Sequence, residues 1–269
     1  MTFLDLERPD HAYMFAFLQA DGHLSRQSRN RGRLSVELSA CDAPVLEEFQ
    51  RLCPYNSSIR HRTRSTNFKA DHTSVTWTVC AREFREELQV LGLPVGRKAD
   101  IVAPPGAPFS ERDYLRGLID ADGSVGITAK GFPFISFATR SDDLAAFCSG
   151  YVERLCGARR TLNRNKRDAV YNILYTKENA LAVSADLYYS GCLAIPRKLA
   201  SAERAAAWIR PADMAVAPPR RRWTPQEDDV LLRAPSLDAV AVQLGRTRTS
   251  CSLRKWRLVG PERARARIR

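Results

Sequence analysis

The sequence predicts an α+β protein made of two similar halves, followed by a small all-α domain. A helix-like run that ends in an acid and a glycine occurs twice, at Asp21-Gly22 and at Asp122-Gly123. Alternation of apolar and polar residues follows each copy, as at 73–80, and indicates strands. The C-terminal segment is basic and spaces its leucines as short helices do. These three observations define the fold class that we expect.

The predicted elements repeat in the same order after each acid. After Asp21 the sequence predicts strands at 34–38, 59–65 and 73–80 and helices at 43–52 and 81–91. After Asp122 it predicts strands at 125–130, 132–140, 159–165 and 170–176 and helices at 142–155 and 177–189. With a further short strand after the first acid, each half is expected to be αββαββα with an antiparallel sheet. The acids are 101 residues apart, which indicates internal duplication with pseudo-twofold symmetry.

Each half closes on a similar phrase that contains an arginine and a lysine. Lys98 lies 77 residues after Asp21, and Lys198 lies 76 residues after Asp122. Segments rich in proline and alanine then mark the linkers. The predicted boundaries are 1–102 for the first repeat, 109–209 for the second and 220–260 for the C-terminal domain, with linkers at 103–108 and 211–219.

The charge of the chain indicates a polyanionic partner. The net charge is +12, and residues 220–269 hold 13 Lys or Arg against 5 Asp or Glu. Seven scattered cysteines form no C-x-x-C pair, and the four histidines lack ligand spacing, so we expect reduced thiols and no zinc site. No apolar run is long enough for a membrane span, and the N-terminus lacks a signal-peptide layout. We therefore expect a protein of the cytosol, in a bacterial, phage or organellar host, without a membrane partner.

Two helices that each end in a carboxylate indicate a shared metal site. Phosphodiester hydrolysis needs an activated water and a stabilised leaving oxygen, and divalent metals supply both. Mg²⁺ (or Mn²⁺) prefers oxygen ligands and keeps several waters, so one carboxylate from each half would suffice. The two helices must then pack closely. Small residues four apart, Ala16 and Ala20 in one helix and Gly117 and Ala121 in the other, permit this approach, and the glycines after the acids are expected to stop the helices.

Residues 115–123, LRGLIDADG, resemble the signature of the LAGLIDADG homing endonucleases and differ from it only at Arg116. The first copy, residues 14–22, is similar at Ala16, Ala20, Asp21 and Gly22 and departs at Phe15, Phe17 and Gln19. Gln19 stands where the second copy has Asp120, and we expect Asp120 to serve packing or interface polarity. The resemblance covers roughly residues 8–208.

The resemblance implies an active site. Asp21 and Asp122 would bind the catalytic metal with the carbonyls of Ala20 and Ala121. Lys98 and Lys198 would be basic residues near the active centre. A chain with two motifs would act as a monomer, straddle double-stranded DNA and cut both strands across the minor groove to leave short 3′ overhangs.

Basic residues in both halves are candidates for DNA contacts through the sheets. The predicted set is Arg26, Arg29, Arg31, Arg33, Arg60, Arg62 and Arg64 in the first half and Arg140, Arg159, Arg164 and Lys166 in the second. Arg60, Arg62 and Arg64 alternate along one predicted strand, so they are expected to share one face of the sheet.

The tail predicts three short helices, with Thr224 capping the first and Gly245 stopping the second. It resembles a Myb/SANT-like helix-turn-helix module with Trp223 and Trp256 as core tryptophans. The resemblance implies a second DNA-binding domain, and its predicted contacts are Arg248, Arg254 and Lys255.

These observations predict a site-specific homing endonuclease that hydrolyses both strands of a long DNA target. One alternative is a DNA-binding transcription regulator that keeps the fold without cleavage. Another is an intron maturase that binds RNA. The presence of both acids favours the nuclease over the regulator, and the helix-turn-helix pattern of the tail favours duplex DNA over RNA.

Overall fold

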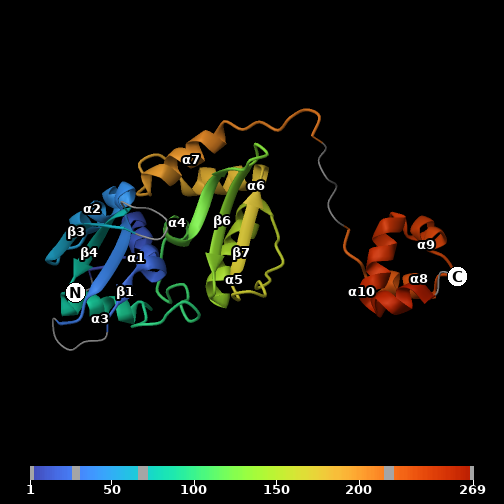
Figure 1. Cartoon of the computed structure of the whole chain (residues 1–269), viewed down its shortest axis with the longest axis horizontal. Coiled ribbons are helices and arrows are strands. Elements are labelled where there is room, and N and C mark those ends of the chain that lie inside the picture. Colours follow the sequence, from blue (N-terminus) through green and yellow to red (C-terminus); the bar gives the residue numbers. More distant parts are fainter. Residues whose placement is uncertain (1–2, 26–30, 66–71, 215–220, 267–269) are drawn as a thin grey trace. The chain divides into compact units, whose positions relative to one another are not determined.

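The computed structural model describes residues 3–25, 31–65, 72–214 and 221–266 of the chain. The chain divides into two compact units, Met1–Arg210 and Pro211–Arg269 (Figure 1). The two repeats share the first unit, and the basic domain forms the second. In these described ranges, no helix combines the length and the apolar character that crossing a membrane requires.

The first repeat has the predicted αββαββα order. Its elements are α1 (Pro9–Asp21), β1 (His23–Leu24), β2 (Leu34–Ser39), α2 (Ala43–Leu52), β3 (Ser57–Arg64), β4 (His72–Val79) and α3 (Arg82–Val90), with a 3₁₀ turn at Ala40–Asp42. The strands form an antiparallel sheet in the order β1-β2-β4-β3. Val75, Trp77 and Val79 alternate inward along β4 and are fully buried. The period-two pattern of the sequence therefore marks the core face of this sheet.

The second repeat departs from the predicted αββαββα order by one missing strand and one additional helix at the end, Pro196–Ala206. Its elements are α4 (Glu111–Asp122), β5 (Gly123–Ile127), β6 (Pro133–Thr139), α5 (Asp142–Cys156), β7 (Tyr171–Thr176), α6 (Glu178–Leu187) and α7 (Pro196–Ala206). The sheet has three strands in the order β5-β6-β7. The strand predicted at 159–165 is wrong: only an isolated bridge pairs Arg164 with Tyr171. Most of this segment is exposed, and it lacks the alternate apolar residues that would bury one face of a strand.

Helices α1 and α4 pack side by side in the middle of the first unit (Figure 1). Every residue from His11 to Gln19 in α1 is buried, so this helix has no solvent-facing stripe. Such all-round burial is typical of a helix enclosed by the core. Because the two helices are central, their C-terminal ends are held in fixed positions by packing from both sheets.

The second unit is a three-helix domain with α8 (Pro225–Arg233), α9 (Leu237–Leu244) and α10 (Arg248–Ala266), the last of which is kinked at Gly260. Thr224 and Glu227 form a capping box at the start of α8, and Gly245 ends α9 in the left-handed conformation, both as expected. The prediction that Trp256 belongs to the core is wrong, because its side chain is 51% exposed. Cys251 and Val240 are fully buried in the core of this small domain.

Candidate active site

The contact between α1 and α4 depends on glycine at position 117. A Cβ added to Gly117 would lie 2.4 Å from the carbonyl oxygen of Tyr13 and 2.8 Å from the Cβ of Ala16. Both distances are shorter than a side chain permits, so only glycine allows this helix spacing. The small residues thus have the role that the sequence analysis assigned to them, and their contact brings the helix ends that carry Asp21 and Asp122 together.

Gly22 and Gly123 end their helices for a reason that differs from the usual one. Their φ angles are −68° and −123°, so neither adopts the left-handed conformation of a common glycine stop. A Cβ at Gly22 would lie 2.5 Å from the carbonyl oxygen of Leu18, and one at Gly123 would lie 2.4 Å from that of Ser136. Glycine is needed at Gly22 because the last turn of its own helix lies against it, and at Gly123 because the backbone of β6 lies there as well.

Asp21 and Asp122 are open to solvent, yet the surrounding protein displaces part of their hydration. Desolvation by burial raises the pKa of Asp122 to about 6, and the negative charge of Asp21 adds to the rise. Burial also raises the pKa of Asp21, while Lys98 and Lys198 act in the opposite direction. The two acids therefore interact electrostatically, and their mutual repulsion favours a cation between them.

Each predicted lysine caps the helix of its own repeat. Lys198 is 5% exposed and donates to the carbonyl oxygens of Ile119 at 2.8 Å, Asp120 at 2.6 Å and Gly123 at 2.8 Å. Lys98 donates to the carbonyls of Leu18, at 2.9 Å, and Gly22. Since an ammonium group has three donors, the hydrogen bonds of Lys198 are saturated. The lysines give a further donor to carbonyls at the helix ends and place positive charge at the negative ends of two helix dipoles.

Replacing Lys198 by methionine is expected to lower the free energy of unfolding by about 2 kcal/mol. The change removes the side-chain donor that three carbonyl oxygens at the end of α4 share. It also removes the cost of burying the charge, the burial that lowers the pKa of Lys198. Urea unfolding measures the difference. Lys130→Met, an exposed lysine beyond β5, is the control and should stay within about 0.5 kcal/mol of the unmodified protein. Equal effects of the two variants would contradict a capping role.

A pair of buried hydrogen bonds joins the repeats beneath the acids, and sequence reasoning missed it. The hydroxyl of Tyr13 in α1 donates to Asp120 in α4 at 2.7 Å, and the hydroxyl of Tyr114 in α4 donates to Gln19 in α1. The two tyrosines are 101 residues apart, as are Gln19 and Asp120, so the same register that links the acids would have found them. Asp120 also accepts from Tyr188 at 2.8 Å and is 1% exposed, which confirms its expected role in interface polarity.

Arg116 is the one residue at which positions 115–123 differ from the LAGLIDADG signature, and its side chain is fully buried. It pairs with Asp113 at 2.6 Å and donates to the carbonyl oxygens of Leu193 and Leu187 at 2.9 Å and 3.0 Å. Its guanidinium lies over the ring of Tyr13 from the other repeat. The residue thus ties α4 to the end of its own repeat and to α1.

The predicted DNA-contacting residues of the first repeat lie on its surface. Arg60, Arg62 and Arg64 are exposed on β3, where alternate register places Arg60 beside Thr76 of β4. Arg31 and Arg33 are also exposed, whereas Arg26 and Arg29 lie outside the described residues. The sheet of this repeat therefore presents a cationic edge strand.

The second repeat presents its cations on loops. A row of neighbouring residues across the three strands of its sheet consists of Ser124, Ser136 and Leu174. None of these side chains is charged, in contrast to Arg60 on β3 of the first repeat. Arg159 and Lys166 lie in the loop before β7 and are exposed. Arg140 pairs with Asp100 at 2.7 Å, and Arg164 pairs with Asp142 at 2.9 Å. Several cations of this half are thus already held by carboxylates.

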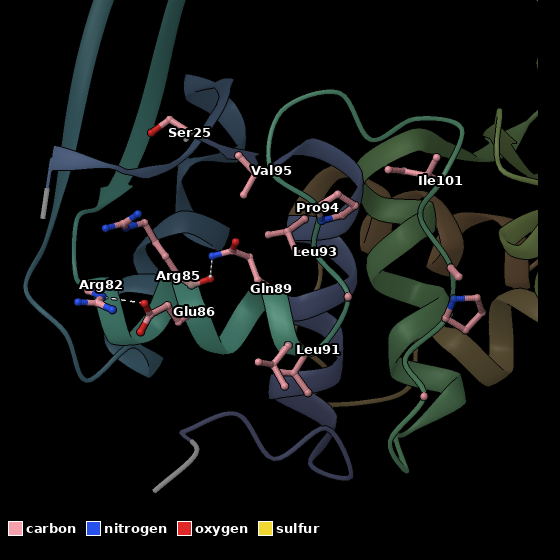
Figure 2. Close-up of a pocket in the computed structure, with 15 residues that line it drawn as sticks. Ser25, Arg82, Arg85, Glu86, Gln89, Leu91, Leu93, Pro94, Val95 and Ile101 are labelled. Carbon is pink, nitrogen blue, oxygen red and sulfur yellow. Dashed lines mark hydrogen bonds and ion pairs between the residues drawn. The ribbon is translucent and has the colours of Figure 1, made fainter. Parts of the chain in front are cut away.

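A large cavity of the first repeat is not lined by the acids. It measures about 1120 Å³ and runs along α3, between Arg82, Arg85 and Gln89 on one side and Leu93 and Pro94 on the other (Figure 2). Asp122 lines a much smaller cavity of about 270 Å³, together with Lys98 and Arg140. A duplex binds across an open surface, so cavity size does not locate the site here. Among the described residues, no cluster of three or more His, Cys, Asp or Glu side chains has metal-binding geometry.

The tail uses much of its positive charge internally. Lys255 is 5% exposed, and Arg254 pairs with Asp228 at 2.5 Å and lies over the ring of Trp223. These two predicted contacts are therefore turned toward the domain itself. Arg248 is exposed and pairs with Asp238 at 2.9 Å. The exposed side of α10 is formed instead by Thr249, Ser252, Leu253, Trp256 and Arg257.

Acid is expected to destabilise the second unit between about pH 4.5 and pH 2. Hydrogen bonds from Arg246, with others from the Thr224 backbone and Arg221, lower the pKa of Glu227 to about 2. A depressed pKa contributes stability above the unfolded value of 4.5, and this contribution is lost as the pH falls toward 2. Hydrogen exchange of residues 225–260 in the full chain, corrected for intrinsic rates, measures it. Glu227→Gln should remove this pH dependence, and an unchanged profile would contradict the assignment.

Comparisons with known proteins agree with the fold. Residues 110–187 match the family model described as a LAGLIDADG-like domain, and they span α4 to α6. The tRNA-splicing ligase RtcB of Methanopyrus kandleri is 32% identical over 132 residues, or 42% of this chain. The aligned region is 13% of that relative's length, so this chain corresponds to a small part of it.

Two solved structures are similar to the first unit. The homing endonuclease I-WcaI bound to its DNA recognition sequence has a TM-score of 0.51 at 11% identity, covering 73% of this chain and 87% of that one. Variants of the homing endonuclease I-DmoI reach 0.48 at 15% identity, with coverage of 73% and 97%. Residues 110–187 are therefore similar to a LAGLIDADG-like domain, and the mixed α+β fold of the chain is similar to that of the homing endonuclease I-WcaI.

Proposed function

We propose that the protein is a metal-dependent, site-specific endonuclease that hydrolyses both strands of double-stranded DNA as a monomer. The observation that carries this proposal is the position of Asp21 and Asp122. They are the last residues of two helices in close contact, and each remains open to solvent. The fold that the chain shares with the DNA-bound I-WcaI supports duplex DNA as the substrate.

The donor atoms fit a hard divalent cation such as Mg²⁺ or Mn²⁺. Asp21 and Asp122 provide carboxylate oxygens, and the carbonyls of Ala20 and Ala121 lie in the last turns of the same helices. The carbonyls that Lys98 and Lys198 bond do not include these two. A bound cation would activate water and stabilise the leaving oxygen.

The remaining residues of the site have positioning roles in this proposal. Lys98 and Lys198 fix the carbonyls around each acid and thereby orient the carboxylates. The exposed arginines of β3 contact phosphates or base edges, and the loop cations of the second repeat contact phosphates. The second unit, with Arg248 and Arg257 on α10, provides additional affinity for duplex DNA.

The test uses the purified full chain with Mg²⁺ and a library of randomised duplexes. The expected result is enrichment of duplexes cut on both strands at a defined position, with 3′ overhangs. Omission of the metal should prevent cutting without preventing binding. Tight duplex binding without nicking in Mg²⁺ or Mn²⁺ would overturn the nuclease and support the non-cleaving regulator.

A further inference from the structure

Asp100 stands in an unusual place for a DNA-binding surface. It belongs to the turn that follows Lys98, and its carboxylate accepts from Arg140 at 2.7 Å and from Arg97 at 3.4 Å. Arg140 follows β6 in the other repeat. A carboxylate here repels the DNA backbone, so its presence needs an explanation.

The turn holds Asp100 in a defined position. The backbone N–H groups of Ile101 and Val102 both donate to the carbonyl of Lys98. The hydroxyl of Ser141, at the start of α5, donates to the carbonyl of Val102 at 2.5 Å. Asp100 is therefore fixed against the corner between β6 and α5, where it meets Arg140.

The pair lies beside the candidate active site and is accessible. Arg140 lines the same small cavity as Asp122 and Lys98. The side chains of Arg140 and Asp100 are 38% and 34% exposed. Exposed ion pairs of this kind are weak and exchange readily with other anions.

The corresponding pair on the other side of the repeat interface is different. Arg197, next to Lys198, binds Asp42 through two hydrogen bonds of 2.9 Å, and the side chain of Asp42 is only 5% exposed. A bidentate pair with a buried acid is suited to holding the repeats together. The Arg197 side chain is itself 57% exposed, but its acid is withdrawn from solvent, whereas both members of the Asp100 and Arg140 pair are accessible.

We infer that Asp100 occupies Arg140 in the free protein and that a DNA phosphate replaces it in the complex, so that Asp100 lowers affinity for duplexes of unrelated sequence. This inference rests on the DNA binding in the proposed function and does not require cleavage. The phosphate gains the guanidinium only by displacing the carboxylate, which reduces the gain from backbone contacts. Since those contacts carry no sequence information, the cost applies to duplexes of any sequence, and an unrelated duplex has no base contacts to offset it.

A double-mutant cycle tests the exchange. Fluorescence anisotropy with a labelled duplex of random sequence, in chelator, gives the Kd of the unmodified full chain and of Asp100→Asn, Arg140→Gln and the double variant. Asp100→Asn is expected to tighten binding about fivefold, and Arg140→Gln to weaken it about fivefold. In the Arg140→Gln background, Asp100→Asn should tighten binding by about twofold at most, because only the longer contact between Asp100 and Arg97 remains to be released.

Glu48→Gln is the matched control, since it removes one carboxylate that pairs with the exposed Arg51. Glu48 lines a cavity with Arg8 and Pro9 at the start of α1, roughly 18 Å from Asp21 along the helix. It should leave Kd within about 1.5-fold. A fivefold gain in affinity from Asp100→Asn that persists in full in the Arg140→Gln background would overturn the proposed exchange of carboxylate for phosphate. An equal gain from Glu48→Gln would also overturn it. Either result would leave the proposed DNA binding intact. Failure of the unmodified chain to bind any duplex would overturn the proposed function as well.

Discussion

Replacement of Asp122 by asparagine in the proposed nuclease is expected to abolish cutting of both strands while duplex binding persists. Asparagine keeps the shape of the side chain and removes the charge that holds the cation. We expect the rate of cleavage to fall at least about a thousandfold, equivalent to about 4 kcal/mol of lost transition-state stabilisation. Single-turnover cleavage of a selected target, with each strand labelled separately, measures the effect.

A measurement of thermal stability distinguishes a loss of catalysis in Asp122→Asn from misfolding of the variant. Burial and the charge of Asp21 raise the pKa of Asp122 to about 6, so the folded protein disfavours the ionised form at neutral pH. Neutral asparagine removes that penalty, and the thermal midpoint of Asp122→Asn should equal or exceed that of the unmodified protein. Cleavage retained within tenfold would refute the role of Asp122.

Asp21→Asn examines the weaker copy of the motif. The structure gives Asp21 the same position at a helix end and the same interaction with Lys98 and Lys198. We therefore expect a loss of cutting similar to that of Asp122→Asn on both strands. A variant that still nicks one strand would indicate that each acid serves its own strand instead of a shared centre.

Replacement of Gly117 by alanine is expected to lower the free energy of unfolding by about 2–3 kcal/mol. The added Cβ would lie 2.4 Å from the carbonyl oxygen of Tyr13, a backbone atom in the core that cannot move aside. This cost exceeds the gain of about 1 kcal/mol that alanine has over glycine inside a helix. Urea unfolding of the full chain, monitored for the first unit, measures the net change.

Gly150 provides a control of opposite sign. It lies inside α5, and a Cβ there would meet only the end of the Arg154 side chain, at 3.6 Å. Gly150→Ala should therefore stabilise the protein by up to about 1 kcal/mol. If Gly117→Ala also stabilised it, α1 and α4 would not be in the close contact on which the position of both acids depends.

The register of the repeat predicted more than the sequence pattern of any single element. The spacing of 101 residues located both acids, both central helices and the order of elements in the first repeat. It failed at 159–165, where duplication predicted a strand but the residues lack an apolar face. Symmetry inherited from a duplication is kept only where the local sequence still buries one side of the element.

The sequence could not predict which side chains are hydrogen-bond or ion-pair partners. Nothing in the spacing of Lys198 indicates that its ammonium points at three carbonyls, or that Asp100 meets Arg140 of the other repeat. The tail shows the same limit. Helical spacing predicted three helices, but the basic residues Arg254 and Lys255 face the domain, and Trp256 faces outward. Which side of a helix is buried depends on where its neighbours pack.

The sequence by itself determined the class of fold, the two repeats and the pair of acids, because periodicity and the position of glycine are local properties of the chain. Only the tertiary structure decided which charges are free to meet a polyanion and which are already paired. That decision depends on distances between residues far apart in sequence. It separates Arg60 and Arg62 of β3 from the arginines that pair with carboxylates, which are Arg64, Arg140, Arg164 and Arg254.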